Sequence, residues 1–497
     1  MGLRSFFAKP FARYVVQKRQ RWLRRPVETQ LNWLSKLVSQ AQRTSFGKDH
    51  HFEDIKTYDD FKKAVPVRDY EDLRPYLERM VAGEANVLWK GKPLYLAKTS
   101  GTTSGVKYIP ITNESVGYHF GSARDAVMSY IAETGKSEFL DKKLIFLSGS
   151  PELEKKNGIY FGRLSGISNH LVPAILRSNQ LPSYETNCID DWETKLDRII
   201  DETIEQPMAL ISGIPPWVQM YFDRIVARTG KPIKDVFPEF SVFVYGGVNF
   251  EPYRAKLFDS IGKQVDFIET YPASEGFIAY QDSQTEEGLL LLLDSGIFYE
   301  FIPTEEFFQP NPRRLHLGEV ELGKNYALVL NTNAGLWGYS IGDTVKFVSL
   351  NPHRIVVTGR IKHFISAFGE HVIGEEVEKA MQYAVSCQPE TQVIEFTVAP
   401  QVTPLDGGLP YHEWLIEFAT PPQNIETFAQ DLDKKMTELN TYYDDLITGN
   451  ILQGLKIKSL QRNAFVEYMK SQGKLGGQNK VPRLANDRRI AEALMFE

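Results

Sequence analysis

From residue 93 onward, short apolar runs alternate with longer helical patterns, and this alternation restricts the possible folds more than any other feature. The runs are rich in β-branched and aromatic residues and end at Gly, Ser or Asn; the clearest cover residues 143–147, 241–245, 265–270, 289–293 and 327–330. Helical patterns separate several of them, as at 192–205 and 217–228. Strands that alternate with helices predict a largely parallel sheet whose functional loops follow the strand ends.

The rest of the chain has a different texture. Residues 30–80 show helical spacing that Pro66 and Pro75 break, so we expect several short helices there. Between residues 289 and 348 strands come closer together and Gly-rich turns divide them, which predicts an antiparallel, barrel-like subdomain.

After Gly359 a smaller α+β pattern begins. We therefore expect an α/β protein with a large N-terminal domain, residues 1–359, made of mixed, mostly parallel sheets with helices and the barrel-like subdomain. A small mobile α+β domain, residues 360–497, would follow, with a hinge near residues 360–363.

Composition excludes several classes of protein. The formal charge is −6 and the pI is about 6.0, which gives no reason to expect a nucleic-acid partner. Two cysteines, Cys188 and Cys387, cannot build a disulfide framework. The longest apolar run, residues 289–293, is far shorter than the roughly 20 residues of a membrane span. We expect a soluble cytoplasmic protein, and a monomer is the simplest expectation.

The amino-terminal segment is basic. It carries eight cationic residues and no acidic one before Glu28: Arg4, Lys9, Arg13, Lys18, Arg19, Arg21, Arg24 and Arg25. The apolar stretch Phe6-Phe7-Ala8 is too short for a secretory signal, and Phe6 stands where a myristoylation motif has Ser or Thr. Two interpretations stay open: a basic amphipathic helix that touches a membrane surface, and, more simply, a helix packed on the domain with a solvated basic edge.

The segment Thr99-Ser-Gly-Thr-Thr-Ser-Gly-Val-Lys107 is the most informative motif. Its glycines let successive backbone N–H groups converge on an anion, and hydroxyls and one cation surround them. Such a loop suits a triphosphate, although it lacks the Gly-Lys-Ser/Thr ending of a Walker A loop. The alternative is an ordinary Ser/Thr/Gly-rich hairpin turn.

Three further loops follow strand-like runs. In Glu269-Thr-Tyr-Pro-Ala-Ser-Glu-Gly276 the carboxylate of Glu275 suits Mg²⁺, which takes one or two carboxylates together with phosphate oxygens. In Tyr245-Gly-Gly-Val248 the paired glycines let a flat ring approach the backbone. In Trp337-Gly-Tyr-Ser-Ile-Gly-Asp343 the final Asp suits the hydroxyls of a ribose. Each loop alone is also compatible with a plain turn.

The order of these loops resembles the adenylate-forming superfamily, whose members activate carboxylates as acyl-AMP. Within it the chain resembles the acyl acid amido synthetases, the auxin-responsive promoter family of plant auxin- and jasmonate-conjugating enzymes. The motifs that carry this resemblance are Tyr-Pro-Ala-Ser-Glu-Gly at 271–276, Val-Pro-Val-Arg-Asp-Tyr-Glu-Asp at 65–72 and Val-Leu-Trp at 87–89. It covers roughly residues 30–490.

The resemblance implies a role for each matching position. The phosphates of ATP would be held by Ser100, Gly101, Thr102, Thr103 and Lys107. The adenine and the α-phosphate would be framed by Gly246, Gly247, Tyr271, Ala273 and Ser274, with Asn169 near the nucleotide. Asp343 would bind the ribose with Arg360 nearby, Glu275 would hold Mg²⁺, and Lys362 would lie at the hinge. Lys480 would be the catalytic lysine that enters the site during adenylation.

The resemblance thus implies an ATP- and Mg²⁺-dependent ligase that joins a small carboxylic acid to an amine, expected to be an amino acid. Two alternatives stay open: an acyl-CoA synthetase, and a catalytically silent nucleotide-binding protein. The loop at 99–105 is closer to the wider superfamily than to the Ser-Ser-Gly-Thr-Ser of the relatives, which leaves the acceptor class less defined than the adenylation. Asn479 and Pro482 around Lys480 differ from the Ser-Gly-Lys of acyl-CoA synthetases and count against coenzyme A.

Overall fold

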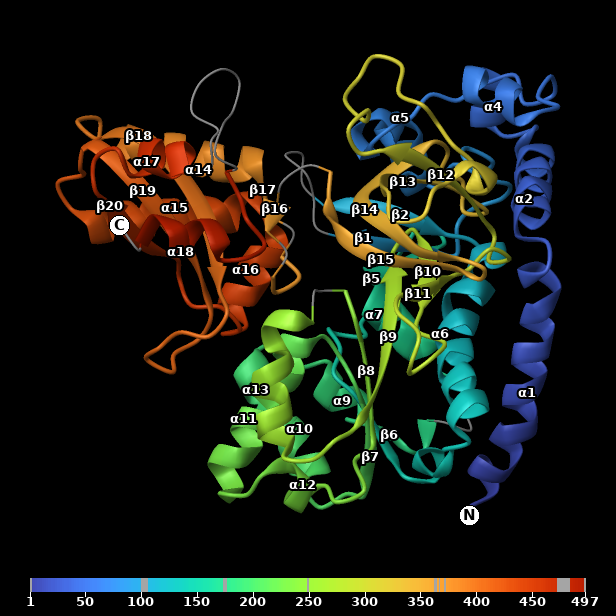
Figure 1. Ribbon diagram of the computed structural model, residues 1–497, viewed down its shortest axis with the longest axis horizontal. Coiled ribbons are helices and arrows are strands. Elements are labelled where there is room, and N and C mark those ends of the chain that lie inside the picture. The colour runs from blue at the N-terminus through green and yellow to red at the C-terminus, as the bar shows by residue number, and fades with distance from the viewer. Residues whose placement is uncertain are drawn as a thin grey trace.

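The structure is a computed structural model of the 497-residue chain. It describes residues 2–99, 106–172, 177–247, 250–361, 364–365, 367–370, 372–471 and 483–495, with the backbone alone at 216, 251–253, 255, 359–360, 364 and 373–375. Figure 1 shows a tall body, which contains the large sheet and the helices of the first part of the chain. A smaller group of helices and strands, formed by the chain after residue 360, lies beside it.

The first 81 residues are helical, as expected. The helices are α1 (Leu3–Leu23), α2 (Pro26–Ala41), α3 (Ser45–Asp49), α4 (Tyr58–Ala64) and α5 (Tyr70–Val81). Pro66 lies between two of them, but the expectation that Pro75 also breaks the pattern is wrong, because Pro75 lies inside α5. Asp69 accepts hydrogen bonds from the N–H groups of Glu71 and Asp72 and so begins that helix firmly before the proline is reached.

The main sheet has eleven strands in the order β12-β13-β14-β15-β11-β10-β9-β8-β7-β3-β6. Their bounds are β3 (Lys143–Phe146), β6 (Gln180–Leu181), β7 (Met208–Ser212), β8 (Val242–Gly246), β9 (Asp266–Ala273), β10 (Gly276–Tyr280), β11 (Leu289–Leu291), β12 (Ile297–Pro303), β13 (Asn325–Thr332), β14 (Tyr339–Leu350) and β15 (His353–Arg360). The expected strand-like runs therefore form strands, and β9 extends further than its run, through Ala273.

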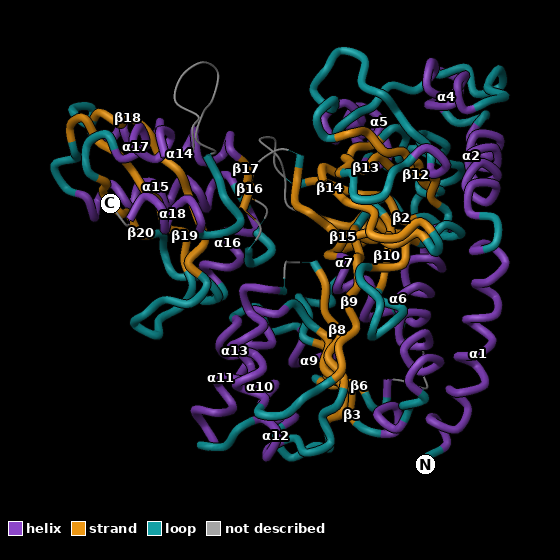
Figure 2. The backbone as a smooth tube through the Cα atoms, viewed as in Figure 1, coloured by secondary structure: helices purple, strands orange, loops and turns teal. Residues whose placement is uncertain are grey.

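The half of this sheet from β6 to β9 is parallel. Figure 2 shows its strands between α6 (Asn113–Thr134) on one side and α10 (Trp192–Thr203), α11 (Pro215–Thr229) and α13 (Glu251–Ile261) on the other. Two short helices, α9 (Tyr184–Asn187) and α12 (Ile233–Val236), lie in the connections. The chain goes from β3 outward to β6 and then returns to β7 on the other side of β3, so the strand order reverses between β3 and β7. Open α/β sheets bind their ligands at such a reversal.

The half from β9 to β12 is antiparallel. The sheet as a whole is mixed, and the described strands of this half continue it rather than close into a barrel. A second sheet has the order β2-β1-β5-β4, formed by β1 (Tyr95–Thr99), β2 (Lys107–Ile111), β4 (Glu154–Lys156) and β5 (Ile159–Arg163). The helix α7 (Leu164–His170) follows β5 and contacts β1.

The chain after β15 forms a separate three-stranded sheet covered by helices. The strands are β18 (Gln392–Gln401), β19 (Tyr411–Thr420) and β20 (Lys456–Leu460), and a short hairpin of β16 (Phe364–Ile365) and β17 (Val372–Ile373) precedes them. The helices are α14 (Gly374–Cys387), α15 (Ile425–Leu439), α16 (Thr441–Thr448), α17 (Ala464–Ser471) and α18 (Arg489–Met495). The α+β pattern is as expected, and the division of the chain at residue 360 stays a prediction.

The helix α16 contacts the body next to β1. The hydroxyl of Tyr442 donates to the carbonyl oxygen of Lys98 at 2.9 Å, and Asp445 forms an ion pair with Arg163 at the end of β5. The guanidinium of Arg163 also lies 5.4 Å from the ring centroid of Tyr442. These contacts place α16 beside the strand that leads into the segment 99–107.

The helix α1 lies along α6 (Figure 1), with small residues on its inner face. Ala8, Ala12 and Val15 are buried in a cluster with residues of α6 and of the short helix η1 (Glu138–Asp141). At its beginning, the Asp141 carboxylate accepts from the N–H groups of Gly2 (2.7 Å), Arg4 and Ser5 (both 3.2 Å). Asp141 therefore caps α1 from another part of the chain. None of the described helices is long and apolar enough to cross a membrane.

Replacing Asp141 by Ala is expected to loosen α1. Loss of a cap costs about 1 kcal/mol, so cleavage of the Arg- and Lys-rich helix by trypsin should accelerate about fivefold. Burial raises the pKa of Asp141, but hydrogen bonds from Ser5, Gly2 and Arg4 outweigh it and leave the pKa below its ordinary value. The cap is therefore complete at neutral pH and is lost as the pH falls through that lowered pKa. The control is Glu138→Ala, whose side chain forms a surface ion pair with Lys9 of α1. Equal rates of trypsin cleavage for the two variants would contradict the role of Asp141 as the cap of α1.

Candidate functional site

The motif at 271–276 is a tight hairpin between β9 and β10. Ala273 pairs with Gly276, so Ser274 and Glu275 form the two-residue turn. A Cβ on Gly276 would lie 2.5 Å from Cδ1 of Ile297, which explains why glycine follows the turn. The Glu275 carboxylate accepts a hydrogen bond from the Tyr339 hydroxyl at 3.3 Å. The turn thus holds one carboxylate at the end of β9, on the side toward β14.

Asp343 lies in the middle of the site and is nearly buried, with 7% of its surface exposed. Its carboxylate accepts a short hydrogen bond from the hydroxyl of Tyr271. Tyr271 belongs to β9 and Asp343 to β14, and these strands are not neighbours in the sheet. The sheet therefore curls so that the two strands face each other, and the Tyr271–Asp343 and Tyr339–Glu275 contacts join the same two segments.

Tyr339 is a residue for which the sequence analysis gave no role. It precedes Asp343 by four positions on β14, but the pairing with β13 shifts between Ser340 and Thr344, and Gly342 has φ of +85°, so strand alternation does not place the two side chains on one face. The only signal in the sequence is that Tyr339 lies in the same motif, 337–343, as Asp343. The pattern of two tyrosines that each hold one carboxylate is visible only once β9 and β14 are known to face each other.

The glycines at 246 and 247 end β8 beside this hairpin. A Cβ on Gly246 would lie 2.3 Å from the carbonyl oxygen of Thr270, and Gly247 has φ of +83°. Gly246 is paired with Thr270, the residue before Tyr271, and the Thr270 hydroxyl donates to Tyr245 O at 2.8 Å. Because β8 and β9 are parallel, both strand ends reach the same edge of the sheet. The structure therefore brings Gly246 and Gly247 next to Tyr271.

The predicted phosphate loop connects β1 and β2. Thr99 and Lys107 are the last paired residues of these antiparallel strands, which follow each other in the chain. Ser100, Gly101, Thr102 and Thr103 lie outside the described residues. Lys107 begins β2, and its Nζ lies 5.3 Å from the ring centroid of Tyr70. The hairpin topology agrees with both interpretations of the segment, so the phosphate role stays a prediction.

The remaining predicted residues are Asn169, Arg360, Lys362 and Lys480. Asn169 is half-buried on α7, which contacts β1. Arg360 pairs with Asp343 through the backbone, but its side chain is not described. Lys362 and Lys480 lie outside the described residues. One hydrophobic cluster joins the two groups of site residues, since it contains Ala97 of β1, Ile167 of α7, Tyr271 and Tyr339.

Glu275 fits a cation that is shared with phosphate oxygens. Among the described residues no group of three or more His, Cys, Asp or Glu side chains gathers to hold a metal alone. Mg²⁺ in nucleotide sites takes only one or two carboxylates, and the nucleotide and water supply the other oxygens. The single carboxylate on the 274–275 turn, that of Glu275, is of that kind.

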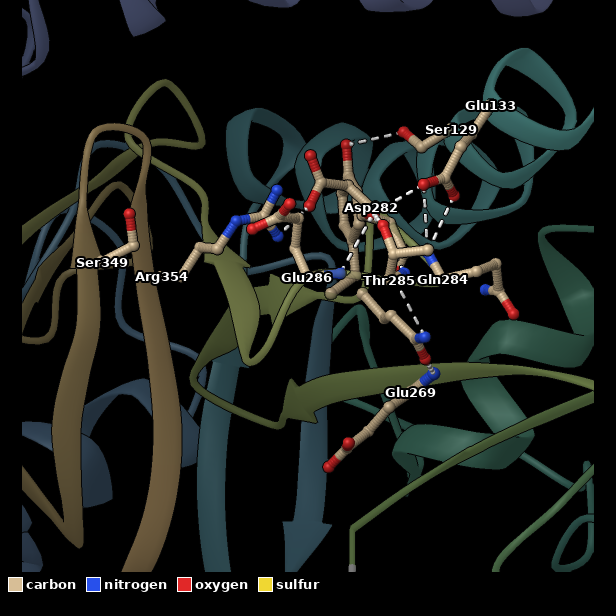
Figure 3. Close-up of polar contacts among 12 residues, drawn as sticks. Ser129, Glu133, Glu269, Asp282, Gln284, Thr285, Glu286, Ser349 and Arg354 are labelled. Carbon is tan, nitrogen blue, oxygen red and sulfur yellow. Dashed lines mark hydrogen bonds and ion pairs between the residues drawn. The ribbon is translucent and has the colours of Figure 1, made fainter.

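A polar cavity of about 280 Å³ lies beside the site, and residues of β8 and β9 form part of its lining. Its lining includes Tyr245 and Glu269, and Figure 3 shows Glu269 with Gln284 and Glu286 from the segment after β10. The Gln284 side-chain amide donates to Phe267 O at 2.8 Å, and its backbone N–H donates to Glu133 of α6 at 2.8 Å. Hydrogen bonds within the protein thus fix this segment against β9 and α6.

A buried lysine lies at the reversal of strand order. Lys195 of α10 is only 3% exposed, and its ammonium donates to Ser148 O at 2.9 Å and Asn187 O at 2.7 Å. Ser148 follows β3 directly, so the ammonium lies near the carboxyl end of that strand. Burial lowers the pKa of Lys195 to about 8. The sequence analysis missed this residue, because its place at the reversal depends on strand order.

The free energy of unfolding is expected to be higher at pH 9.5 than at pH 7, and Lys195 should cause the difference. Its pKa is about 8 in the folded chain and 10.5 ordinarily, so the unfolded chain binds more protons in this range. Raising the pH from 7 to 9.5 therefore increases the free energy of unfolding by about 2 kcal/mol. Urea unfolding at both pH values should show this gain for the wild type and not for Lys195→Met. The same gain in both proteins would contradict a buried, charged Lys195.

Three family models match the chain. The GH3 family N-terminal domain matches residues 16–194, the GH3 family central domain residues 290–360, and the GH3 family C-terminal domain residues 375–489. The chain is 24% identical to indole-3-acetic acid-amido synthetase GH3.3 of Arabidopsis thaliana, over 89% of this chain and 86% of that protein. It is 22% identical to jasmonoyl–L-amino acid synthetase GH3.5 of Oryza sativa subsp. japonica, over 86% of each chain.

Solved structures share the fold. The GH3.15 acyl acid amido synthetase superimposes with a TM-score of 0.59 and 18% identity, covering 96% of this chain and 95% of that one. A 2-hydroxyisobutyryl-CoA ligase in its thioesterification state also gives a TM-score of 0.59, with 13% identity, over 94% and 91% of the two chains. At such identities the likeness concerns the fold alone, and it does not separate an amide-forming from a thioester-forming protein.

Proposed function

Because the chain belongs to the GH3 family, we propose that it is an ATP-dependent ligase that activates a small carboxylic acid as acyl-AMP and transfers the acyl group to an amine. One relative is an amido synthetase and another a jasmonoyl–L-amino acid synthetase, which supports an amino acid as acceptor. The observation that carries the proposal is the pair of tyrosine–carboxylate contacts, Tyr271–Asp343 and Tyr339–Glu275, at the end of β8 and β9.

The proposal gives each residue of the site a task. Asp343 binds the ribose, and Tyr271 fixes the orientation of its carboxylate. Gly246 and Gly247 leave room for the adenine, because a side chain at either position would collide with Thr270 or need a strained backbone. Glu275 holds Mg²⁺ together with the phosphates, and the cation supplies charge neutralisation when bound. The hairpin loop 100–105 and Lys107 hold the phosphates.

The small C-terminal part delivers Lys480 to the site in this proposal. Residues 360–497 form a mobile domain, and Lys480 from it reaches the site during adenylation. In the present arrangement α16 contacts Lys98 and Arg163 of the body through Tyr442 and Asp445. The domain brings Lys480 into the site and then moves away, which leaves room for the amine. A hinge near residues 360–363 permits this movement.

The test is ATP–pyrophosphate exchange with a panel of aryl and alkyl carboxylic acids, followed by mass spectrometry of products formed with amino acids or with coenzyme A. We expect acid-dependent exchange and an N-acyl amino acid product. Exchange with a thioester as the only product would replace the amine by coenzyme A. ATP binding without exchange for any acid would identify a silent nucleotide-binding protein and overturn the proposal.

A further inference from the structure

The helix α1 is apolar on two separate faces. Its inner face, with Ala8, Ala12 and Val15, packs on α6 and η1. Its outer face carries large side chains that are exposed to solvent by 75%, 60%, 60%, 39% and 58%: Leu3, Phe6, Phe7, Phe11 and Tyr14. At about 100° per residue, positions 3, 7, 11 and 14 fall within one quarter of the helix circumference, with position 6 beside it. The buried positions 5, 8, 12 and 15 fall within another quarter, centred about 120° away.

The outer side chains gather into one surface. The rings of Phe6 and Phe7 are 5.4 Å apart between centroids, and those of Phe11 and Tyr14 are 6.3 Å apart. The guanidinium of Arg124 on α6 lies 5.4 Å from the centroid of the Phe11 ring. Single exposed apolar residues are normal on a protein surface, but a contiguous aromatic group usually marks an interaction site. We call Leu3, Phe6, Phe7, Phe11 and Tyr14 the outer face of α1.

Charge gives this surface its selectivity. The first 27 residues contain eight basic and no acidic residues, whereas the remaining chain has 49 basic against 63 acidic residues. Arg19 points inward, where it pairs with Asp282 at 3.2 Å, so it belongs to the interior. Arg13, Lys18 and Arg21 are exposed beside the outer face. The helix therefore offers aromatic rings flanked by exposed cations, on a body that is otherwise strongly acidic.

We propose that the outer face of α1 binds the surface of an anionic lipid membrane, with the helix lying in the plane of the interface. Aromatic and leucine side chains enter the headgroup boundary, and long basic side chains reach the lipid phosphates and carboxylates from the edge. A second copy of the chain suits this face poorly, because it would bring the exposed Arg13, Lys18 and Arg21 of one copy close to the same cations of the other. The anchoring of α1 by Asp141 and Arg19 keeps the helix on the body while its outer face is occupied.

The experiment is sedimentation with lipid vesicles, using the full chain. We expect the wild type to bind vesicles of phosphatidylcholine and phosphatidylserine at least tenfold more tightly than vesicles of phosphatidylcholine alone, and to bind less at high salt. The triple variant Phe6→Ser/Phe7→Ser/Phe11→Ser should lose at least tenfold in binding, and Arg13→Glu/Lys18→Glu/Arg21→Glu should lose the preference for anionic lipid. These side chains are exposed, and unchanged urea unfolding verifies that the variants fold.

The matched control is Phe308→Ser, which removes a phenylalanine that is 70% exposed elsewhere on the body. It should bind vesicles as the wild type does. Absence of binding to anionic vesicles, or equal binding by the wild type and the triple variant, would overturn the proposal. Light scattering that shows a dimer abolished by the triple variant, without vesicle binding, would overturn it in favour of a second copy. Because the site residues are untouched, this outcome is independent of the adenylation test.

Discussion

Lys480→Ala should lose acid-dependent ATP–pyrophosphate exchange by a factor of about 10²–10³. The carboxylate that attacks and the phosphate that it attacks are both anions, so the transition state accumulates negative charge. Removing one well-placed group that stabilises such charge costs about 2.7–4 kcal/mol, which corresponds to that factor. Exchange is measured with saturating acid, so that the loss reports on the adenylation step itself.

The control for this variant is in the same stretch of chain. Lys474→Ala removes a lysine six positions earlier in the same Gly-rich segment, and it should exchange as the wild type does. A synthetic acyl-adenylate supplied with the amine tests the second half of the reaction, which Lys480→Ala should still perform at close to the normal rate. Equal exchange by the two lysine variants would remove Lys480 from the adenylation site.

Much of the fold follows from local pattern. The runs at 143–147, 241–245 and 265–270 become β3, β8 and β9, because apolar, β-branched segments that end at small residues favour buried strands. The α+β pattern expected after Gly359 is also present, and its helix α15 begins at Ile425 because Asn424 caps it. The errors are also local: Pro75 lies inside α5, because the cap at Asp69 starts the helix before the proline.

The candidate site was predictable as a set of loops but not as an arrangement. Glu275 and Asp343 were identified by residue type, whereas Tyr339, which orients one of them, was not. The reason is that β9 and β14 meet only because the sheet curls, and curvature has no local sequence signal. Lys195 was missed for a similar reason: its position at the reversal between β3 and β7 is a property of strand order.

The helix α1 shows how a pattern can leave two interpretations open. A helix that is apolar on one face has a clear periodicity, but α1 is apolar on two separate faces, so its sequence predicts neither packing nor an interface alone. The structure confirms the packed face, through Ala8, Ala12 and Val15. The exposed Phe6, Phe7 and Phe11 show that the second face is also present.

The second large effect is expected at Asp343. If its carboxylate accepts both ribose hydroxyls, Asp343→Asn loses charge-assisted hydrogen bonds that contribute about 1.5–3 kcal/mol. The KM for ATP in the exchange reaction should therefore rise about ten- to hundredfold, with a smaller change in kcat. Tyr271→Phe removes only the hydroxyl that orients the carboxylate, so it should raise the KM less.

A merely structural role for Asp343 would also reduce activity, so the decisive comparison uses the nucleotide. The wild type should prefer ATP strongly over 2′-deoxy-ATP and 3′-deoxy-ATP, because each analogue lacks one hydroxyl that the carboxylate binds. Asp343→Asn should lose most of this preference, since the partner of the missing hydroxyl is weakened, whereas Tyr271→Phe should keep part of it. A variant that is impaired equally with ATP and with both analogues, and that keeps the wild-type preference, would show that Asp343 supports the sheet and does not bind the ribose.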